Sequence, residues 1–197
     1  MNRDEAFAEI NRTQDYYIDK LADMIKDNGY TMLKTINFTS DTGTGKTKMM
    51  GKLINKFPDY YFIITTLSKS QLYQQTERSL AKDCPQKNYE RWRVYGTASF
   101  KSNSRLQADD IIRAIPQDKK DKVIWLRDEG HIATNKFDEV LLDTKETSEL
   151  TPDEAKTIIE GICYAVINIS ATNSVGTGIK CNFANTMMLR TVQYGAI

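Results

Sequence analysis

The sequence predicts an α/β protein with a doubly wound, mainly parallel sheet and helices on both faces. Two observations lead to this prediction. Apolar runs of strand length alternate with segments of helical period along most of the 197 residues. One such run, residues 32–39, leads directly into a glycine-bearing loop and then into an amphipathic helix, which is the order of elements in a parallel strand–loop–helix unit.

The individual elements follow from local patterns. Residues 4–26 carry apolar side chains at helical spacing, and Asn28-Gly29 ends this first helix. Strands are expected at 32–39, 60–66, 92–95, 123–126, 163–169 and 187–192. Further helices are expected after the glycine-bearing loop, over 68–80, over 104–115 and from Thr151 onward. The run 60–66 is apolar, aromatic and β-branched, as expected of a strand covered on both faces.

Composition limits the classes of protein that this chain can represent. With 40% hydrophobic and 27% charged residues, it resembles an ordinary globular domain with one substantial core. The net charge of +1 supplies no global basic field, so nucleic-acid binding would need a local patch. Three scattered cysteines indicate reduced thiols and a cytoplasmic location. No apolar run is long enough to span a membrane.

The loop at residues 40–47, Ser-Asp-Thr-Gly-Thr-Gly-Lys-Thr, predicts a phosphate-binding site. Loop N–H groups and a helix N-terminus present positive partial charge to a polyphosphate, and glycines allow close backbone approach. Lys46 would reach the outer phosphates, and Thr47 would ligate Mg²⁺. The residues expected to cradle the nucleotide are Thr42, Gly43, Thr44, Gly45, Lys46 and Thr47. The alternative is a surface turn with an incidental lysine.

A second chemical signal follows the apolar run 123–126, which ends in Arg127-Asp128-Glu129-Gly130-His131. In a parallel sheet, ligands bind at the carboxyl ends of strands, so these acids are expected beside the phosphate loop. We assign Asp128 to the metal and Glu129 to the attacking water, with Lys46 completing the catalytic set. The alternative for an isolated Asp-Glu pair is a solvated turn. His131, the only histidine, has a coupling role or a purely structural one.

Taken together, these stretches resemble the motifs of superfamily-two helicases. Residues 40–47 resemble motif I, residues 128–131 resemble the DExH box, and Ser170-Ala171-Thr172 resembles motif III. Residues 66–75 look like motif Ia, and residues 97–100 look like the next motif that contacts nucleic acid. The group with the most similar pattern is that of type III restriction subunits and DEAD/DEAH translocases. Departures from the family pattern are Ser40, Arg127 and Asn173, where small, apolar and proline residues are usual.

The resemblance implies an ATP·Mg²⁺-binding motor domain of the RecA-like fold, here residues 31–197, preceded by an N-terminal helix, residues 1–30. Gln14, upstream of motif I, would read adenine. His131, Ser170 and Thr172 would couple hydrolysis to nucleic acid, with DNA preferred over RNA. The residues that would contact the strand are Ser68, Lys69, Thr97 and Lys101.

The resemblance also implies a partner. Such helicases bind ATP between two RecA-like domains, and the second domain supplies an arginine finger worth about 10³–10⁵ in rate. We therefore expect a second RecA-like domain, in the same or another chain, and slow hydrolysis by this chain alone. The alternatives are a non-catalytic nucleotide-binding or protein-interaction module, and another P-loop ATPase such as a kinase.

Overall fold

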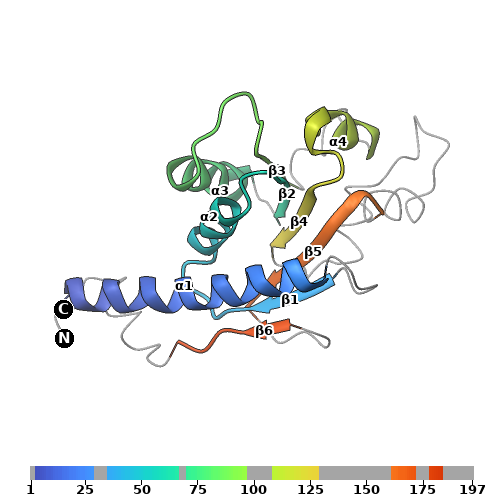
Figure 1. Ribbon diagram of the computed structural model, residues 1–197. Helices are drawn as coiled ribbons and strands as arrows, with labels where there is room; N and C mark the ends of the chain where they lie inside the picture. The colour runs from blue at the N-terminus through green and yellow to red at the C-terminus, as the bar shows by residue number, and fades with distance from the viewer. Residues whose placement is uncertain are drawn as a thin grey trace.

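The computed structural model describes residues 3–28, 35–66, 70–96, 108–128, 161–171 and 178–183, and there the chain forms an open six-stranded sheet (Figure 1). The strands are β1 (Thr35–Thr39), β2 (Tyr61–Thr66), β3 (Trp92–Gly96), β4 (Val123–Asp128), β5 (Cys163–Ser170) and β6 (Gly178–Lys180). Their spatial order is β3-β2-β4-β5-β1-β6, and every pairing is parallel. The predicted α/β class is confirmed.

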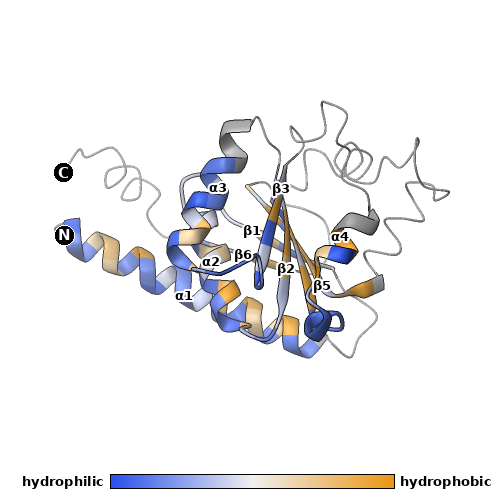
Figure 2. Cartoon of the chain, turned by 90° about the horizontal axis from the view of Figure 1, so that it is seen from above, coloured by the Kyte–Doolittle hydropathy of each residue, from blue (hydrophilic) through white to orange (hydrophobic). Residues whose placement is uncertain are grey.

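Helices cover both faces of the sheet. They are α1 (Arg3–Asn28), α2 (Lys46–Lys56), α3 (Ser70–Asp83), α4 (Ala108–Ala114) and the short 3₁₀ helix η2 (Gln117–Lys119). The first three share one core with β1 to β5, and α4 packs on the opposite face against Tyr61, Val123 and Trp125. Because parallel strands are covered on both faces, β2 is buried at all six positions. Strand β5 is hydrophobic along much of its length, whereas hydrophobic and hydrophilic residues alternate along α1 (Figure 2).

Most element boundaries agree with the sequence pattern, and three differences matter. Strand β4 continues to Asp128, so this acid belongs to the strand and not to the loop after it. Strand β6 was not predicted, because three residues carry little periodic signal. Phe7, expected on the buried face of the first helix, is 42% exposed. The predicted strand at 187–192 and most of the helix from Thr151 lie outside the described residues.

Three polar contacts at regular spacing, which we call the α1–α2 ladder, join helix α1 to α2. Lys48 Nζ donates to Asn11 Oδ1 at 2.8 Å, and the next pairs, Lys52–Asp15 and Lys56–Asp19, lie one helical turn apart on both helices. The equal spacing of four residues on each helix requires the two helices to run parallel. Apolar side chains of α1, including Ile18 and Ile25, complete the same core beneath the ladder. The first helix is thus an integral part of the layer that carries the phosphate loop.

No helix in the described portion of the chain is long and apolar enough to cross a membrane. The longest, α1, has 26 residues but carries charged side chains along its outer surface.

Candidate nucleotide-binding site

The loop between β1 and α2 adopts a conformation that its two glycines make possible. Gly43 has φ of 85°, and Gly45, the residue before the helix, has φ of 80° and ψ of 41°. Both values lie in the left-handed region, which residues with a Cβ atom rarely adopt. Met49 N–H then donates to Gly45 O at 3.0 Å and closes the first helical turn. The N–H groups at the start of an α-helix point out of its N-terminal end and are suited to bind an anion, and the loop leads directly into this end of α2.

Ser40, the main departure from the usual loop pattern, is buried and holds the loop together. Its hydroxyl lies 2.5 Å from the hydroxyl of Thr44, and the Thr44 hydroxyl also donates to Asp41 O at 2.7 Å. Since a hydroxyl has one hydrogen, Ser40 is the donor in the first of these bonds. The Ser40 N–H donates to Ser170 O at 2.9 Å. A serine here therefore links the loop to itself and to β5.

Gln14 of α1 contacts the same loop. Its side chain is 2% exposed, and Nε2 donates to Thr44 O at 2.8 Å. A Cβ atom added at Gly45 would lie 2.6 Å from this nitrogen, so a larger residue there would displace the end of the Gln14 side chain in addition to straining the backbone. Gln14 Oε1 is buried and has no hydrogen-bond partner among the described residues. The predicted upstream glutamine thus reaches the site, and it binds the loop through its amide nitrogen.

Asp128 lies at the carboxyl end of β4, on the same edge of the sheet as the loop. Strand β5 separates β4 from β1, and neighbouring strands are about 4.8 Å apart, so the acid's strand lies about 10 Å from the loop's strand. Thr66, at the end of β2, donates to Asp128 Oδ2 at 3.4 Å. Ser170 ends β5 between them, in register with Thr39. The sheet order thus brings the loop, the acid and the motif III-like serine to one edge.

Arg127 precedes this acid and is 6% exposed. Its guanidinium lies 4.0 Å from the ring centroid of Trp125, two residues earlier on the same face of β4. The indole N–H of Trp125 donates to Thr65 Oγ1 on the neighbouring strand, which fixes the ring beneath the guanidinium. A buried guanidinium is favourable over an aromatic face, because the ring quadrupole attracts a cation. This contact explains how an arginine is accommodated where an apolar residue is usual.

Cys181, just after β6, packs behind the loop. Its N–H donates to Thr39 O at 2.7 Å, and its side chain is buried. Burial raises the pKa of this thiol to about 12, while a hydrogen bond with the Ser40 side chain lowers it and the charge of Asp41 raises it further. The thiol is thus uncharged at neutral pH and acts as a small apolar side chain. All three cysteines of the chain are free and buried, which agrees with the prediction of unpaired thiols.

Several predicted residues lie outside the described part of the chain, so their placement stays a prediction. They are Glu129 and His131 after β4, Thr172 after β5, and the expected strand contacts Ser68, Lys69, Thr97 and Lys101. Among the described residues, no three His, Cys, Asp or Glu side chains gather into a metal-binding cluster. Mg²⁺ commonly takes one or two protein ligands together with phosphate oxygens and water, and Thr47 and Asp128 fit that kind of site.

No protein-family model matches the chain, and no curated protein is significantly similar to it.

Proposed function

We propose that this chain is an ATP-binding motor domain of a nucleic-acid-dependent ATPase of the helicase or translocase kind. The observation that carries the proposal is the geometry of one sheet edge. There, a loop with glycines at positive φ leads into α2, and Asp128 ends the strand next but one to β1. A lysine and a hydroxyl at the start of a helix, with a carboxylate across the sheet, suit a Mg²⁺-bound triphosphate.

Each residue has a stated role in this proposal. The N–H groups from Thr42 to Thr47 bind phosphate oxygens, and Lys46 neutralises the outer phosphates. Thr47 and Asp128 hold Mg²⁺, which when bound supplies positive charge to the phosphate oxygens. Glu129 orients the attacking water and accepts its proton.

The hydrogen bond between Ser40 and Ser170 supports a coupling role for β5. A change in the loop on nucleotide binding would act directly on the residue that ends β5. Ser170 and Thr172 of this segment, with His131, would pass that change to a bound nucleic-acid strand. Ser68, Lys69, Thr97 and Lys101 would contact its phosphates.

The proposal includes partners. A second RecA-like domain, in the same or another chain, would close the nucleotide site and supply an arginine finger. The nucleic acid is proposed to be DNA, and the location is proposed to be the cytoplasm. A net charge of +1 predicts weak and salt-sensitive strand binding by this chain alone.

The proposal is tested by measuring ATP binding and turnover, with and without single-stranded DNA or RNA. We expect wild type to bind ATP·Mg²⁺, and Lys46→Ala to bind it at least tenfold more weakly. Glu129→Gln is expected to bind ATP normally and to hydrolyse it more slowly than wild type. ATP binding with wild-type turnover no higher than that of Glu129→Gln would favour the non-catalytic module, and transfer of phosphate to a metabolite would favour a kinase. Absence of ATP binding would refute the proposal.

A further inference from the structure

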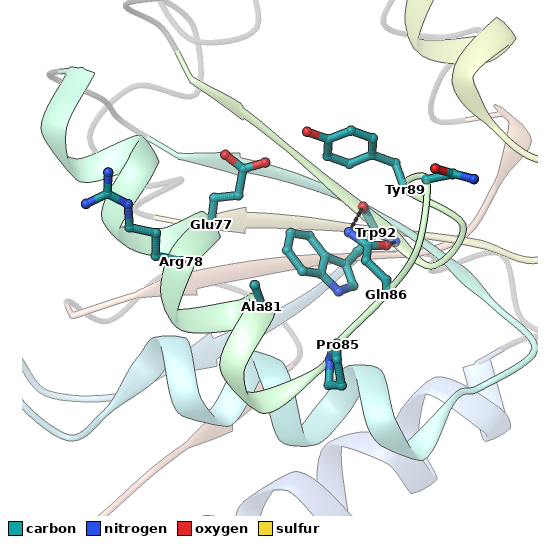
Figure 3. A pocket seen from close by; sticks show the side chains of 8 residues that line it. Glu77, Arg78, Ala81, Pro85, Gln86, Tyr89 and Trp92 are labelled. Atoms are coloured by element: carbon teal, nitrogen blue, oxygen red, sulfur yellow. Dashed lines mark hydrogen bonds between the residues drawn. The ribbon is translucent and has the colours of Figure 1, made fainter.

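Two adjoining hollows lie along α3, at a distance in sequence from the phosphate loop. One, of about 390 Å³, is lined by residues of α3 alone, including Ser79 and Lys82. The other, of about 490 Å³, lies between α3 and the turn that leads into β3 (Figure 3). Arg78 lines both hollows, so they lie next to each other on the surface of α3. We refer to the two hollows together as the α3 groove.

The first hollow has the chemistry of a phosphate site. Among the described residues, its lining consists of two cations, Arg78 and Lys82, together with the Ser79 hydroxyl and the amides of Gln74 and Gln75, and includes no carboxylate. Phosphate oxygens in protein complexes are bound mainly by arginine, lysine, hydroxyl and amide donors. In Figure 3 the Arg78 side chain reaches outward from α3, away from Trp92. Arg78 is exposed and lines both hollows, so its guanidinium is accessible to a ligand in either of them.

The second hollow has an aromatic lining. Glu77 and Tyr89 stand on either side of the indole of Trp92, and Ala81 and Pro85 add apolar surface (Figure 3). Tyr89 is 47% exposed, and its ring offers a stacking surface for a planar group. The Glu77 carboxylate is an acceptor that suits the amino group of a base such as cytosine.

The turn that carries Tyr89 has a strained backbone. Asn88 and Tyr89 have φ of 49° and 56°, although neither is glycine. The guanidinium of Arg93 lies 5.2 Å from the centroid of the Tyr89 ring and holds it in place. Non-glycine residues at positive φ cost free energy and persist only where the surrounding structure enforces them. The tyrosine is therefore placed at the groove before any ligand arrives.

Gln86 fixes the other end of the turn to the edge strand. Its Oε1 accepts from the N–H groups of Arg91 and Trp92, and its Nε2 donates to Trp92 O at 2.8 Å. The side chain thus pairs with the start of β3 as a neighbouring strand would. Trp92 in turn donates its indole N–H to Cys84 O at 3.0 Å. Both sides of the second hollow are therefore fixed by hydrogen bonds to backbone groups.

We propose that the α3 groove binds a nucleotide unit, with its phosphate at Arg78 and Lys82 and its base stacked on Tyr89. Trp92 is the first residue of β3, so the aromatic hollow lies at the amino end of that strand, whereas the phosphate loop follows the carboxyl end of β1. The groove is thus a separate site, and ATP hydrolysis is not required for it. The unit comes either from a nucleic-acid strand or from a free nucleotide.

The test uses fluorescence anisotropy with a labelled 12-nucleotide oligo-dC, and calorimetry with cytidine monophosphate. Arg78→Ala combined with Lys82→Ala is expected to weaken oligonucleotide binding at least tenfold and to reduce its salt dependence by about two counterions. Tyr89→Ala is expected to weaken binding about fivefold or more without changing the salt dependence. The matched control combines Lys120→Ala with Lys122→Ala, two exposed lysines beside β4 with the same change in charge.

The outcomes separate the two sources and the two sites. Binding of the oligonucleotide alone identifies a strand, and binding of cytidine monophosphate that depends on Tyr89 but not on Lys46 identifies a free nucleotide. Equal affinity of the groove variants and the lysine control would overturn the proposal, as would a failure of both probes to bind. Unchanged thermal midpoints show that the variants are folded. Because these measurements need no ATP, failure of the proposed ATPase would not affect their outcome.

Discussion

The N–H of Ser40 donates a 2.9 Å hydrogen bond to the carbonyl of Ser170, which joins the first residue of the phosphate loop to the last residue of β5. The two residues are 130 positions apart in sequence and become neighbours only because β1 and β5 pair in parallel. Ser40 also binds the Thr44 hydroxyl inside the loop. One buried serine therefore connects the conformation of the loop with the end of the adjacent strand.

Replacing Ser40 by alanine tests the role of its hydroxyl inside the loop. The variant loses the hydroxyl bond to Thr44 but keeps the backbone bond to Ser170. We expect a loss of about 1 kcal/mol in the free energy of unfolding, because one buried hydrogen bond is removed without leaving a void. ATP affinity should fall severalfold, since the loop becomes less ordered. Urea titration and nucleotide binding measure the two effects, and unchanged values for both would contradict the structural role of the hydroxyl.

Replacing Gln14 by alanine distinguishes two roles for that residue. Because Nε2 donates to Thr44 O, the variant should make the phosphate loop less ordered. It should then weaken the binding of ATP and of inorganic tripolyphosphate, which has no base, by the same factor. The affinity for each ligand should fall 5- to 30-fold, or by about 1–2 kcal/mol, because the variant leaves the buried Thr44 carbonyl without its hydrogen-bond donor. Asp19→Ala, at the far end of the α1–α2 ladder, serves as the control. A loss confined to ATP would instead indicate that Gln14 reads adenine.

Two glycine-to-alanine variants, one the test and one its control, probe the packing of β6 against β1. A Cβ atom at Gly178 would lie 2.0 Å from the carbonyl oxygen of Asn37, whereas one at Gly161 would meet nothing within 4 Å. Gly178→Ala must therefore push β6 away from β1, and we expect a loss of about 1–3 kcal/mol in the free energy of unfolding. Gly161→Ala should be close to neutral. Amide hydrogen exchange at Cys181, whose N–H binds Thr39 O, reports the separation directly, and unaltered exchange would contradict it.

Stability is expected to fall at high pH. Burial raises the pKa of Cys84 to about 11, and that of Cys181 and Tyr61 to about 12, from ordinary values of 9 and 10. Above pH 9 the unfolded chain loses these protons while the folded chain keeps them, so the free energy of unfolding decreases as pH rises. Between pH 8 and pH 10, the two thiols together should lower the free energy of unfolding by about 1–3 kcal/mol.

Urea titration at both pH values measures this loss. Cys181→Ala removes one of the three groups and should reduce the difference between pH 8 and pH 10. A thiol reagent at pH 8 provides an independent check, because protonated buried thiols react slowly. Equal stability at the two pH values, or rapid modification of the native protein, would contradict the assignment.

The sequence predicted the elements whose pattern is local. The apolar side chains that recur three and four residues apart after the loop are all buried: Met49, Met50, Leu53, Ile54 and Phe57. The glycines of the loop adopt the positive φ angles for which their lack of a Cβ atom suits them. Periodicity and backbone permissiveness depend on neighbouring residues alone, so both can be recognised without knowledge of the tertiary structure.

Other features depend on pairs of residues that are distant in sequence. The pattern gave no indication of β6, because a three-residue strand is stabilised by β1 and not by its own composition. The polar ladder between α1 and α2 also escaped notice, since Asp15 and Lys52 each look like ordinary surface charges. The aromatic hollow of the α3 groove likewise arises only where the turn at Tyr89 meets the helix.

The sequence by itself thus determined the α/β class, and it predicted a phosphate-binding loop and the chemical groups of that loop. The tertiary structure decided how these groups are held. Ser40 looked like a tolerated exception and is a buried donor to Thr44, and Gln14 looked like a base reader and donates to the loop carbonyl. The physical reason is that a hydrogen bond needs its donor and acceptor about 3 Å apart, a condition that strand order and helix packing impose.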